Sequence, residues 1–361
     1  METLFLNRTG LPKVAIIADD ITGALDASAP FALRGLRTIV AANQKNLTKA
    51  LRTEPQVIAV STNSREMTPD DALAATLGVT AALKGVECLF KKVDSRLKGH
   101  VGVETTALAK SRNLSSVLLC PSIPDIGRIV MNGQIHGPGI SQPLDVRSMV
   151  KSSDIPFHYA DASSEKDLDV LIEGAISRGD QLLSGARGLA DALSRHFIGC
   201  ATRTINKPEL LLPLAVAIGS RDPITLEQVV ALRAARPDVP VLAAPNGAFS
   251  DEVPEADVVI LQATEGALPA DPNAVERLFA ASFVPALSKE RQTLILTGGS
   301  TAAAILEHMG IGLLHLLSEV APGIPVSQAI DTATPLQIVT KSGGFGAESI
   351  LLDLIEQTIS R

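Results

Sequence analysis

Hydrophobic residues in this chain gather into short aliphatic runs, and longer stretches with helical spacing separate several of them. The runs are continuous, which is typical of strands buried on both faces of a parallel sheet. In the first half they predict strands at residues 14–18, 38–42, 57–61, 88–93, 117–120 and 156–160. In the second half the predicted strands are residues 214–218, 239–243, 258–262, 293–297 and 336–340.

Helical patterns lie between these runs, with good examples at residues 24–34, 70–83, 225–235 and 301–309. Strands that alternate with helices indicate an α/β fold with mostly parallel sheets. Because 361 residues exceed what one hydrophobic core usually serves, we expect two such domains. The pattern breaks near Pro208, so the predicted domains are residues 1–207 and 208–361, with the active site in the cleft between them.

Composition and charge exclude several classes of protein. The net charge is -7, and no long run of Lys and Arg is present, which argues against a nucleic-acid partner. No apolar stretch approaches the roughly 18 residues that would span a bilayer. The three cysteines form no C-x-x-C pair, so we expect a cytoplasmic protein in which Cys88, Cys120 and Cys200 are small core residues.

Ligands of open parallel sheets bind beyond the carboxyl ends of the strands, so the residues after each run are the candidates for catalysis and ligand binding. Asp19 and Asp20 follow the first strand directly. A carboxylate there can orient a substrate hydroxyl or take its proton, which makes Asp20, with Asp19, the candidate catalytic pair. A helix cap at Asp20 is the plainer alternative, because Asp is a favoured cap residue.

Basic and polar residues follow three other strands of the first half. Arg and Lys suit a carboxylate ligand, because Arg grips it with two hydrogen bonds and Lys adds charge. A solvated charged loop is the alternative. The candidate substrate-binding residues are Asn63, Arg65, Lys92, Asp94, Ser95, Arg96 and Arg128.

Glycine turns follow the strands of the second half. Such turns expose backbone N–H groups where a helix dipole favours anions, which is how phosphates are held. Two of them in one domain favour a nucleotide, and Lys341 adds a positive charge. The candidate nucleotide-binding residues are Ser220, Gly298, Gly299, Ser300, Thr301, Lys341, Gly343 and Gly344.

Several known signatures are absent from the sequence. It contains no P-loop, no G-x-G-x-x-G after a strand, no G-x-S-x-G and no H-E-x-x-H. The six histidines give no zinc spacing, so no metal ligands are assigned.

Seven segments together resemble the four-carbon acid sugar kinase family, over nearly the whole chain. They are ADDITGALD at 18–26, KVDSRLKG at 92–99, residues 121–128 with Gly133 and His136, residues 219–225, TGGSTAAAIL from Thr297, PGIPV from Pro322 and KSGGFG from Lys341. The resemblance implies a two-domain kinase that moves the γ-phosphate of ATP, with Mg²⁺ expected from the reaction, onto the terminal hydroxyl of threonate, erythronate or 3-oxo-tetronate. It also implies that the N-terminal domain binds the acid and the C-terminal domain the nucleotide. The stretch between Asp145 and Pro156 is shorter than in the family.

Two other classes stay open on the sequence alone. One is a non-catalytic sugar-acid sensor, which would bind no nucleotide. The other is an aldolase or isomerase of sugar acids; an aldolase that forms a Schiff base needs a desolvated Lys, which borohydride would trap. The expected partner is a small sugar acid, with a homodimer possible, and the sequence does not identify the acid or its stereochemistry.

Overall fold

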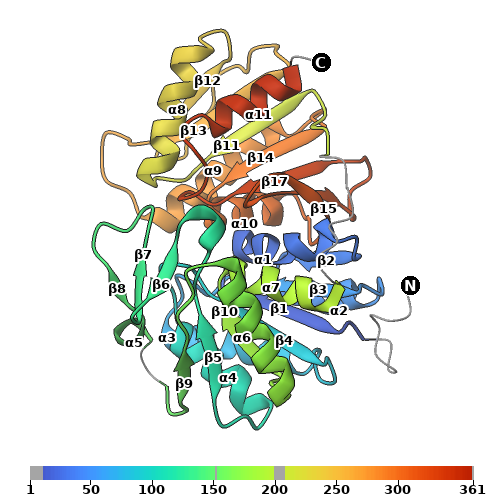
Figure 1. Ribbon diagram of the computed structural model, residues 1–361. Helices are drawn as coiled ribbons and strands as arrows, with labels where there is room; N and C mark the ends of the chain where they lie inside the picture. The colour runs from blue at the N-terminus through green and yellow to red at the C-terminus, as the bar shows by residue number, and fades with distance from the viewer. Residues whose placement is uncertain (1–10, 151–152, 199–207, 360–361) are drawn as a thin grey trace. The chain divides into compact units, whose positions relative to one another are not determined.

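The computed structural model describes residues 11–150, 153–198 and 208–359. The chain divides into two compact units, Met1–Ile205 and Asn206–Arg361. Figure 1 labels their elements. The predicted boundary at 207/208 borders residues 199–207, which lie outside the described residues, as does Cys200.

The first unit contains a parallel sheet of aliphatic strands in the order β2-β3-β1-β4-β10-β5-β9. The six predicted strands are confirmed with small shifts at their ends. The strand β10, which lies between β4 and β5, was not predicted, because its short run LLSG carries only two aliphatic residues. The strands are β1 (Val14–Ala18), β2 (Thr38–Ala41), β3 (Val57–Ser61), β4 (Cys88–Lys92), β5 (Val117–Cys120), β9 (Phe157–Tyr159) and β10 (Leu182–Gly185).

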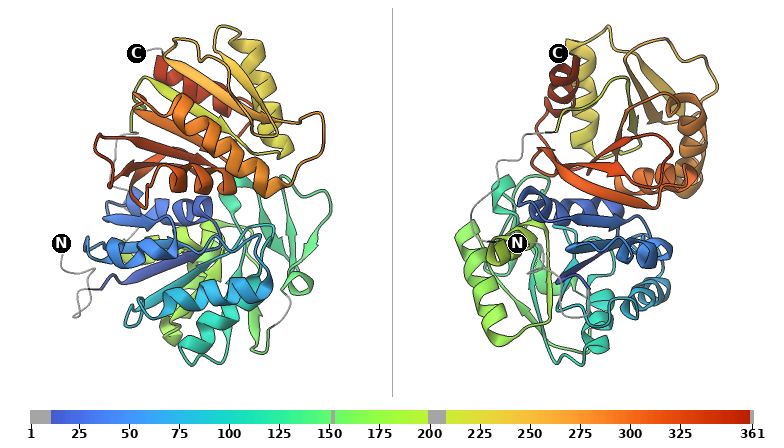
Figure 2. Two further views of the ribbon diagram at one scale, coloured as in Figure 1. Left: turned by 180° about the vertical axis from the view of Figure 1, so that it is seen from behind. Right: turned by 90° about the vertical axis from the view of Figure 1, so that its right-hand side faces the viewer.

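Helices cover both faces of this sheet, as the right-hand view of Figure 2 shows. On one side α3 packs against α4, and on the other α7 packs against both α1 and α6. The helix α3 begins after Thr68, whose hydroxyl accepts a hydrogen bond from the N–H of Asp71. The helices are α1 (Ile21–Leu33), α2 (Leu47–Leu51), α3 (Pro69–Thr80), α4 (Val101–Ser111), α5 (Val146–Met149), α6 (Glu165–Arg178) and α7 (Arg187–Ile198).

A small antiparallel sheet is inserted after β5. It consists of β6 (Ile129–Met131), β7 (Gln134–His136) and β8 (Leu144–Asp145). Val130 and Ile135 of this sheet share a hydrophobic cluster with Val93, Leu97 and Val101. The cluster therefore fixes the loop between β4 and α4, which carries several of the predicted site residues.

The second unit contains a mixed sheet in the order β12-β13-β11-β14-β17-β16-β15. The first five strands are parallel, and β16 and β15 continue antiparallel. The five predicted strands are confirmed, whereas the β15–β16 hairpin was not predicted. The strands are β11 (Leu214–Ile218), β12 (Val241–Pro245), β13 (Val258–Thr264), β14 (Thr293–Thr297), β15 (Leu313–Ala321), β16 (Ile324–Ala329) and β17 (Gln337–Lys341).

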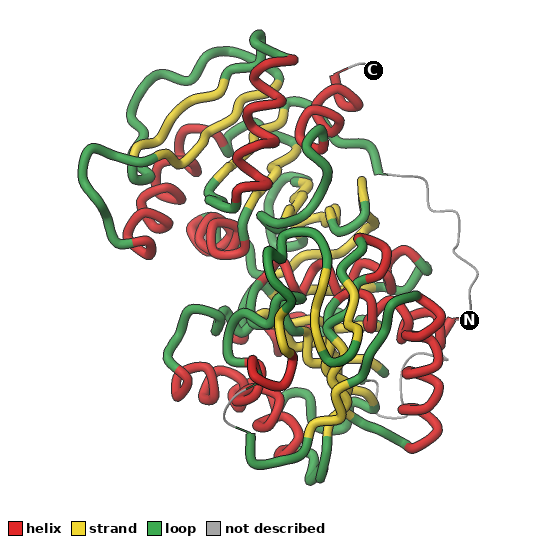
Figure 3. Tube along the Cα trace, turned by 60° about the vertical axis from the view of Figure 1, so that its left-hand side comes forward, coloured by secondary structure: helices red, strands yellow, loops and turns green. Residues whose placement is uncertain are grey.

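Four helices flank this second sheet. The pair α8 (Pro223–Ala235) and α11 (Ile350–Ile359) lies on one face, and the pair α9 (Pro272–Leu287) and α10 (Gly299–His308) on the other. Figure 3 shows the strands of each unit enclosed by its own helices. Both units are thus α/β, as predicted. None of the described helices combines the length and apolar character needed to cross a bilayer.

Candidate functional site

The carboxyl ends of five strands meet at one edge of the first sheet. Ala18, the last residue of β1, pairs with Ser61 of β3 and with Lys92 of β4, and Lys92 pairs with Gly185 of β10. Gly185 in turn pairs with Cys120 of β5. Polar residues that follow these strands therefore gather in one place, as their positions in the sequence predicted.

An arginine and two aspartates form the centre of this edge. The Arg65 guanidinium donates from Nε and Nη2 to the two Asp19 oxygens, at 2.9 and 2.8 Å, and from Nη1 to Asp20 Oδ2 at 2.7 Å. The loop backbone reinforces the cluster, since the N–H of Arg65 donates to Asp19 O at 3.3 Å. Three of the predicted residues thus form one hydrogen-bonded group.

The charges in this cluster stabilise one another. Burial alone would raise the pKa of Asp19, but the charge and hydrogen bonds of Arg65, with Lys91 and Lys92 nearby, lower it to about 2. Burial would lower the pKa of Arg65, yet the charges of Asp20 and Asp19 raise it well above its usual value. Asp19 and Arg65 are therefore both charged at neutral pH.

Asp20 caps the helix that follows it. Its Oδ1 accepts from the N–H of Gly23 at 2.7 Å, and its Oδ2 accepts from the Thr22 hydroxyl at 2.9 Å. A carboxylate has about four acceptor positions. Among the described residues, Gly23, Thr22 and Arg65 supply three donors, which leaves room for one further donor such as a substrate hydroxyl. The cap is confirmed, and it is compatible with the predicted catalytic role.

Two glycines permit the close packing of this cluster. A Cβ atom at Gly23 would lie 2.6 Å from Asp20 Oδ1 and 3.3 Å from Lys92 Nζ, so the Lys92 ammonium lies beside the start of α1. A Cβ atom at Gly99, where φ is +84°, would lie 2.7 Å from Asp19 Oδ2. The predicted Lys92 thus belongs to the same site as the aspartates.

The other predicted substrate-binding residues shape the neighbouring loops. Asp94 Oδ1 accepts from the N–H of Arg96 at 2.8 Å, and Arg96 is partly exposed. Arg128 is 2% exposed and donates to Ser95 Oγ at 2.6 Å and to the Pro138 carbonyl at 2.7 Å. Arg128 thereby ties the small sheet to the β4–α4 loop.

Asn63 holds a strained turn beside this loop. Its φ is 52°, and its Oδ1 accepts from the Ser61 hydroxyl at 2.5 Å. The side chain of Asn63 is thus engaged with its own loop.

Four buried charged residues near this edge, Asp26, Lys91, Glu104 and Arg187, were not among the predicted site residues. Lys91 pairs with Glu104, and Arg187 pairs with Asp26 and Asp125. Burial raises the pKa of Asp26 to about 6, against the opposing charges of Lys92 and Arg187. Asp26 was visible in the ADDITGALD segment, whereas the burial of Lys91, Glu104 and Arg187 depends on the tertiary fold.

The glycine turns of the second unit also meet at a carboxyl edge. Ile218 of β11 pairs with Thr297 of β14, and Thr297 pairs with Lys341 of β17. The turns after these strands touch one another, because a Cβ atom at Gly343 would clash with Ser220 Oγ.

The loop after β14 contacts the same residues. A Cβ atom at Gly219 would clash with Thr301, and one at Gly298 would lie 3.4 Å from Ser220. The fold therefore brings the predicted Ser220, Gly298, Thr301 and Gly343 together.

The start of α10 has the features of a phosphate site. Its cap residue Gly298 has φ 93° and ψ 135°, a conformation suited to glycine, and provides no side-chain cap. The first N–H groups of the helix are thus open to an anion on the side of the positive dipole end. Gly299 is partly exposed, and the exposed Ser300 donates its hydroxyl to Glu276.

Lys341 lies differently from what its sequence suggested. It is 0% exposed, and its Nζ donates to Thr225 Oγ1 at 3.1 Å and to the carbonyls of Ser342 and Gly343 at 3.2 and 3.4 Å. An ammonium has three donors, so these partners occupy all of them. Burial lowers the pKa of Lys341 to about 8, against the opposing charge of Asp222. Lys341 therefore shapes the loop of Gly343 and the partly exposed Gly344.

A cavity of about 460 Å³ adjoins Gly219 at this edge. Its lining includes Asn246, which follows β12, and residues 263–270, which include the end of β13. Its size is within the range of small-molecule sites. The signal that could have found it is Thr264-Glu265-Gly266, which follows a predicted strand.

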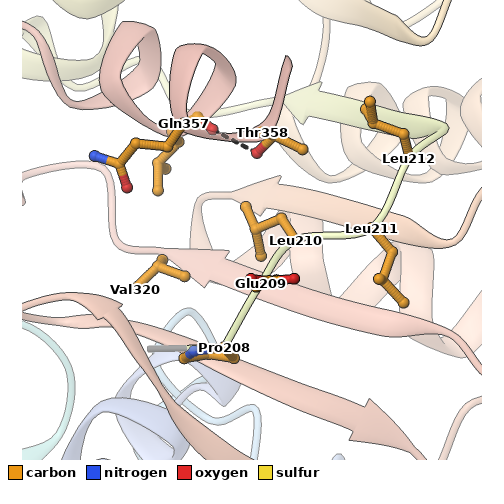
Figure 4. A pocket seen from close by; sticks show the side chains of 9 residues that line it. Pro208, Glu209, Leu210, Leu211, Leu212, Val320, Gln357 and Thr358 are labelled. Atoms are coloured by element: carbon orange, nitrogen blue, oxygen red, sulfur yellow. Dashed lines mark hydrogen bonds between the residues drawn. The ribbon is translucent and has the colours of Figure 1, made fainter. Parts of the chain in front are cut away.

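A second cavity, of about 270 Å³, lies elsewhere in the unit (Figure 4). It is lined by residues 208–212 together with Val320, Leu354, Gln357 and Thr358. Residues 208–212 precede the amino end of β11, whereas the glycine turns follow the carboxyl ends of their strands. This cavity is therefore separate from the edge formed by the glycine turns.

Comparison with known proteins matches each unit to a domain family. Residues 14–162 match a sugar-binding N-terminal domain, and residues 215–351 match a nucleotide-binding C-terminal domain. A D-threonate kinase from Cupriavidus necator is 30% identical, with 93% of this chain and 95% of that protein covered. The chain belongs to the four-carbon acid sugar kinase family. This sugar-acid kinase is also 26% identical to a 3-oxo-tetronate kinase from Burkholderia multivorans, over 93% of this chain and 95% of that protein.

A solved structure supports the fold of the kinase. The crystal structure of a Haemophilus influenzae protein assigned to DUF1537 matches with a TM-score of 0.67 at 19% identity, covering 96% of this chain and 99% of that chain. This structure confirms the predicted α/β fold, whereas the two domain families and the named relatives confirm the predicted family and kinase activity. The alternatives of a sensor or an aldolase lose their basis.

Proposed function

We propose that the kinase transfers the γ-phosphoryl group of ATP to the terminal hydroxyl of a four-carbon sugar acid of the threonate, erythronate or 3-oxo-tetronate type. The observation that carries this proposal is the cluster of Asp19, Asp20 and Arg65 beside Lys92. It offers an acceptor for a hydroxyl and positive charge for a carboxylate at one strand edge. Relatives named D-threonate kinase and 3-oxo-tetronate kinase support the choice of acid.

In the first domain, we assign the carboxylate of the acid to Lys92 and Arg96, assisted by Arg65. Arg65 uses three of its five N–H donors on the aspartates, so two remain for a ligand oxygen. Ser95, held by Arg128, and Asp94 and Asn63 in the adjoining turns would contact the hydroxyls of the acid. The acid would thus lie over the end of β4, with its terminal hydroxyl directed to β1.

Asp20 would orient the terminal hydroxyl. Its remaining acceptor position receives the O–H, so that the oxygen lone pair is free to attack phosphorus. Asp19, which stays ionised beside Arg65, would hold the substrate and keep the local charge balanced.

In the second domain, the phosphates of ATP would bind the N–H groups of Gly299, Ser300 and Thr301. Gly298, whose own N–H donates to the Lys341 carbonyl at 2.9 Å, would complete the cradle with Ser220, Gly343 and Gly344. Lys341 would hold the cradle in shape. The cavity beside Gly219 would receive the nucleoside, because it opens next to the phosphate-binding turns. We place the two domains at residues 1–207 and 208–361.

Mg²⁺ is expected to accompany ATP. Within the described residues no group of three or more His, Cys, Asp or Glu side chains could hold a metal, which fits an ion bound mainly by phosphates and one or two carboxylates. Asp222 is the carboxylate that borders the cradle, since its Cβ lies 3.0 Å from the position of a Cβ at Gly343. When bound, Mg²⁺ would neutralise charge on the transferring phosphate. We further propose a cytoplasmic location, where ATP is available and the buried free thiols of Cys88 and Cys120 stay reduced.

A substrate screen tests this function. ADP release is measured with threonate and erythronate of both configurations, 3-oxo-tetronate and the uncharged alcohol threitol, each with ATP and Mg²⁺. We expect turnover of at least one acid and little with threitol, with NMR coupling that places phosphorus on the terminal CH₂. Preference for threitol, or phosphate on an internal hydroxyl, would contradict the proposal.

A further inference from the structure

A chain of buried polar groups lies behind the aspartate cluster. Lys91 Nζ is 2.6 Å from Glu104 Oε2, and the Ser64 hydroxyl donates to Glu104 Oε1. Thr62 Oγ1 lies 2.7 Å from Ser64 Oγ and 3.0 Å from the Ala18 carbonyl, and its single proton can be donated to either of these two acceptors. The chain therefore joins β4, α4, the loop after β3 and the end of β1.

Burial makes this chain costly as a stabilising device. Lys91 and Glu104 are each 1% exposed, and Ser64 is 0% exposed. Removing two charges from water costs several kcal/mol each, so a buried ion pair rarely adds net stability over well-packed apolar residues. Both Glu104 oxygens have partners, Lys91 in an ion pair and Ser64 in a hydrogen bond, and such paired buried groups fix one arrangement of their neighbours. A role in geometry explains the network better than a role in stability.

The chain of buried polar groups ends beside Arg65 on one side and beside Asp19 on the other. Ser64 directly precedes Arg65, and Ala18 directly precedes Asp19. The loop is therefore held from behind by Glu104, while the guanidinium at its front binds Asp19 and Asp20. A small displacement of Ser64 would move Arg65 relative to both carboxylates.

We infer that Glu104, with its charge balanced by Lys91, is a positioning residue that acts through Ser64 to fix Arg65 on the Asp19–Asp20 pair. The inference rests on the proposed function for the role of that pair in phosphoryl transfer. Neither Glu104 nor Lys91 touches the proposed substrate; their effect passes through the loop.

The substitution Ser64→Ala breaks the chain without leaving a charge unpaired, since Lys91 and Glu104 keep each other. Ser194→Ala is the matched control. Ser194 is also 0% exposed and its hydroxyl donates to the Asp191 carbonyl at 2.7 Å, but it lies two turns along α7, away from the loop. Each variant is measured for kcat/KM with the acid, for ADP affinity, for Tm and for the titration of Asp19 by carboxyl NMR.

We expect Ser64→Ala to lower kcat/KM for the acid at least tenfold with ADP affinity unchanged. The pKa of Asp19 should rise from about 2, because Arg65 no longer holds its place. Ser194→Ala should change neither quantity. Equal losses of activity in both variants, or no loss and no change of the Asp19 pKa in Ser64→Ala, would overturn the inference.

A pair of double variants tests Glu104 itself. Lys91→Met with Glu104→Gln removes both charges and keeps an acceptor for Ser64, whereas Lys91→Met with Glu104→Leu removes the acceptor as well. We expect the second pair to lose at least tenfold more kcat/KM than the first at similar Tm; equal activity would contradict the role of Glu104. If the wild type phosphorylates none of the acids, the proposed function fails, while the Asp19 titration still decides the positioning role.

Discussion

Asp20 has two duties that a single substitution separates. Its carboxylate caps α1, and it faces Arg65 with one acceptor position to spare. Asn caps a helix nearly as well as Asp but offers the hydroxyl a weaker acceptor without charge. Asp20→Asn should therefore lower kcat by about 10² to 10⁴ while Tm changes little. Steady-state kinetics and a thermal melt of the variant check this.

The two duties predict different outcomes. If Asp20 only caps α1, Asp20→Asn keeps near-normal kcat. If Asp19→Asn alone abolished turnover, the orienting role would belong to Asp19. Affinity for ADP serves as the control, because nucleotide binding belongs to the second domain.

Because burial raises the pKa of Asp26, we predict an unusual dependence of the protein's stability on pH. Its pKa is raised from 3.8 to about 6, so the folded state binds its proton more tightly than the unfolded chain does. Stability from this group is fully present below about pH 4 and is lost as the pH rises through about 6. A shift of this size corresponds to about 3 kcal/mol. Asp26→Asn should therefore gain Tm relative to the wild type between pH 5 and pH 8, and parallel melting curves over this range would refute the prediction.

The candidate site could be predicted only as far as strand ends reveal it. Asp19, Arg65 and Lys92 follow strands whose ends align, so their proximity follows from the parallel sheet. The direction of a side chain is decided by packing, which the sequence does not display. For that reason Lys341 was expected beside the phosphates, although its ammonium turns into its own loop. The partner of Lys91, on α4, was equally hidden.

At the scale of elements, two glycines at opposite ends of α10 give a controlled test of the phosphate site. Gly298 has φ 93° at the start of α10, and Gly310 has φ 70° just past its end, with nothing within 4 Å of a Cβ atom. Alanine at either position costs about 1–3 kcal/mol in backbone strain. Only Gly298→Ala should also weaken ADP binding, by about tenfold or 1.4 kcal/mol. Calorimetry measures the affinity of each variant for ADP. Equal affinities in the two variants would show that the phosphates do not bind at the start of α10.

The residue types and burial of each strand explain which strands could be predicted. β1, β3 and β14 are wholly buried and are aliphatic apart from Ser61, Thr293 and Thr297 at strand ends, so the hydrophobic pattern alone defines them. β10 has only two aliphatic residues and is a strand because β4 and β5 lie on either side of it. β15 has partly exposed positions among its buried ones, and β16 carries Pro325, Ser327 and Gln328 among its apolar residues, so neither is a continuous aliphatic run.

At the scale of the whole molecule, the two ligands should protect different domains from hydrogen exchange. The amides at Gly299–Thr301 and the turns at 219–222 and 342–344 would be covered by ADP. The turns at 19–23, 61–65 and 94–98 would be covered by the sugar acid. Exchange measured with each ligand separately checks this. Protection of residues 94–98 by ADP alone would reverse the assignment of domains.

If the acid binds as proposed, the small sheet of β6, β7 and β8 would serve this enzyme as a replaceable specificity module. In the part of the chain that the structure describes, it forms no ladder with the parallel sheet, yet its hydrophobic cluster and Arg128 hold the β4–α4 loop to which the acid is assigned. Mutations there can reshape the loop while the strands that carry Asp19 and Asp20 keep their register. Evolution, or a protein engineer who grafts residues 129–145 from a relative, can therefore change the preferred acid without rebuilding the catalytic edge.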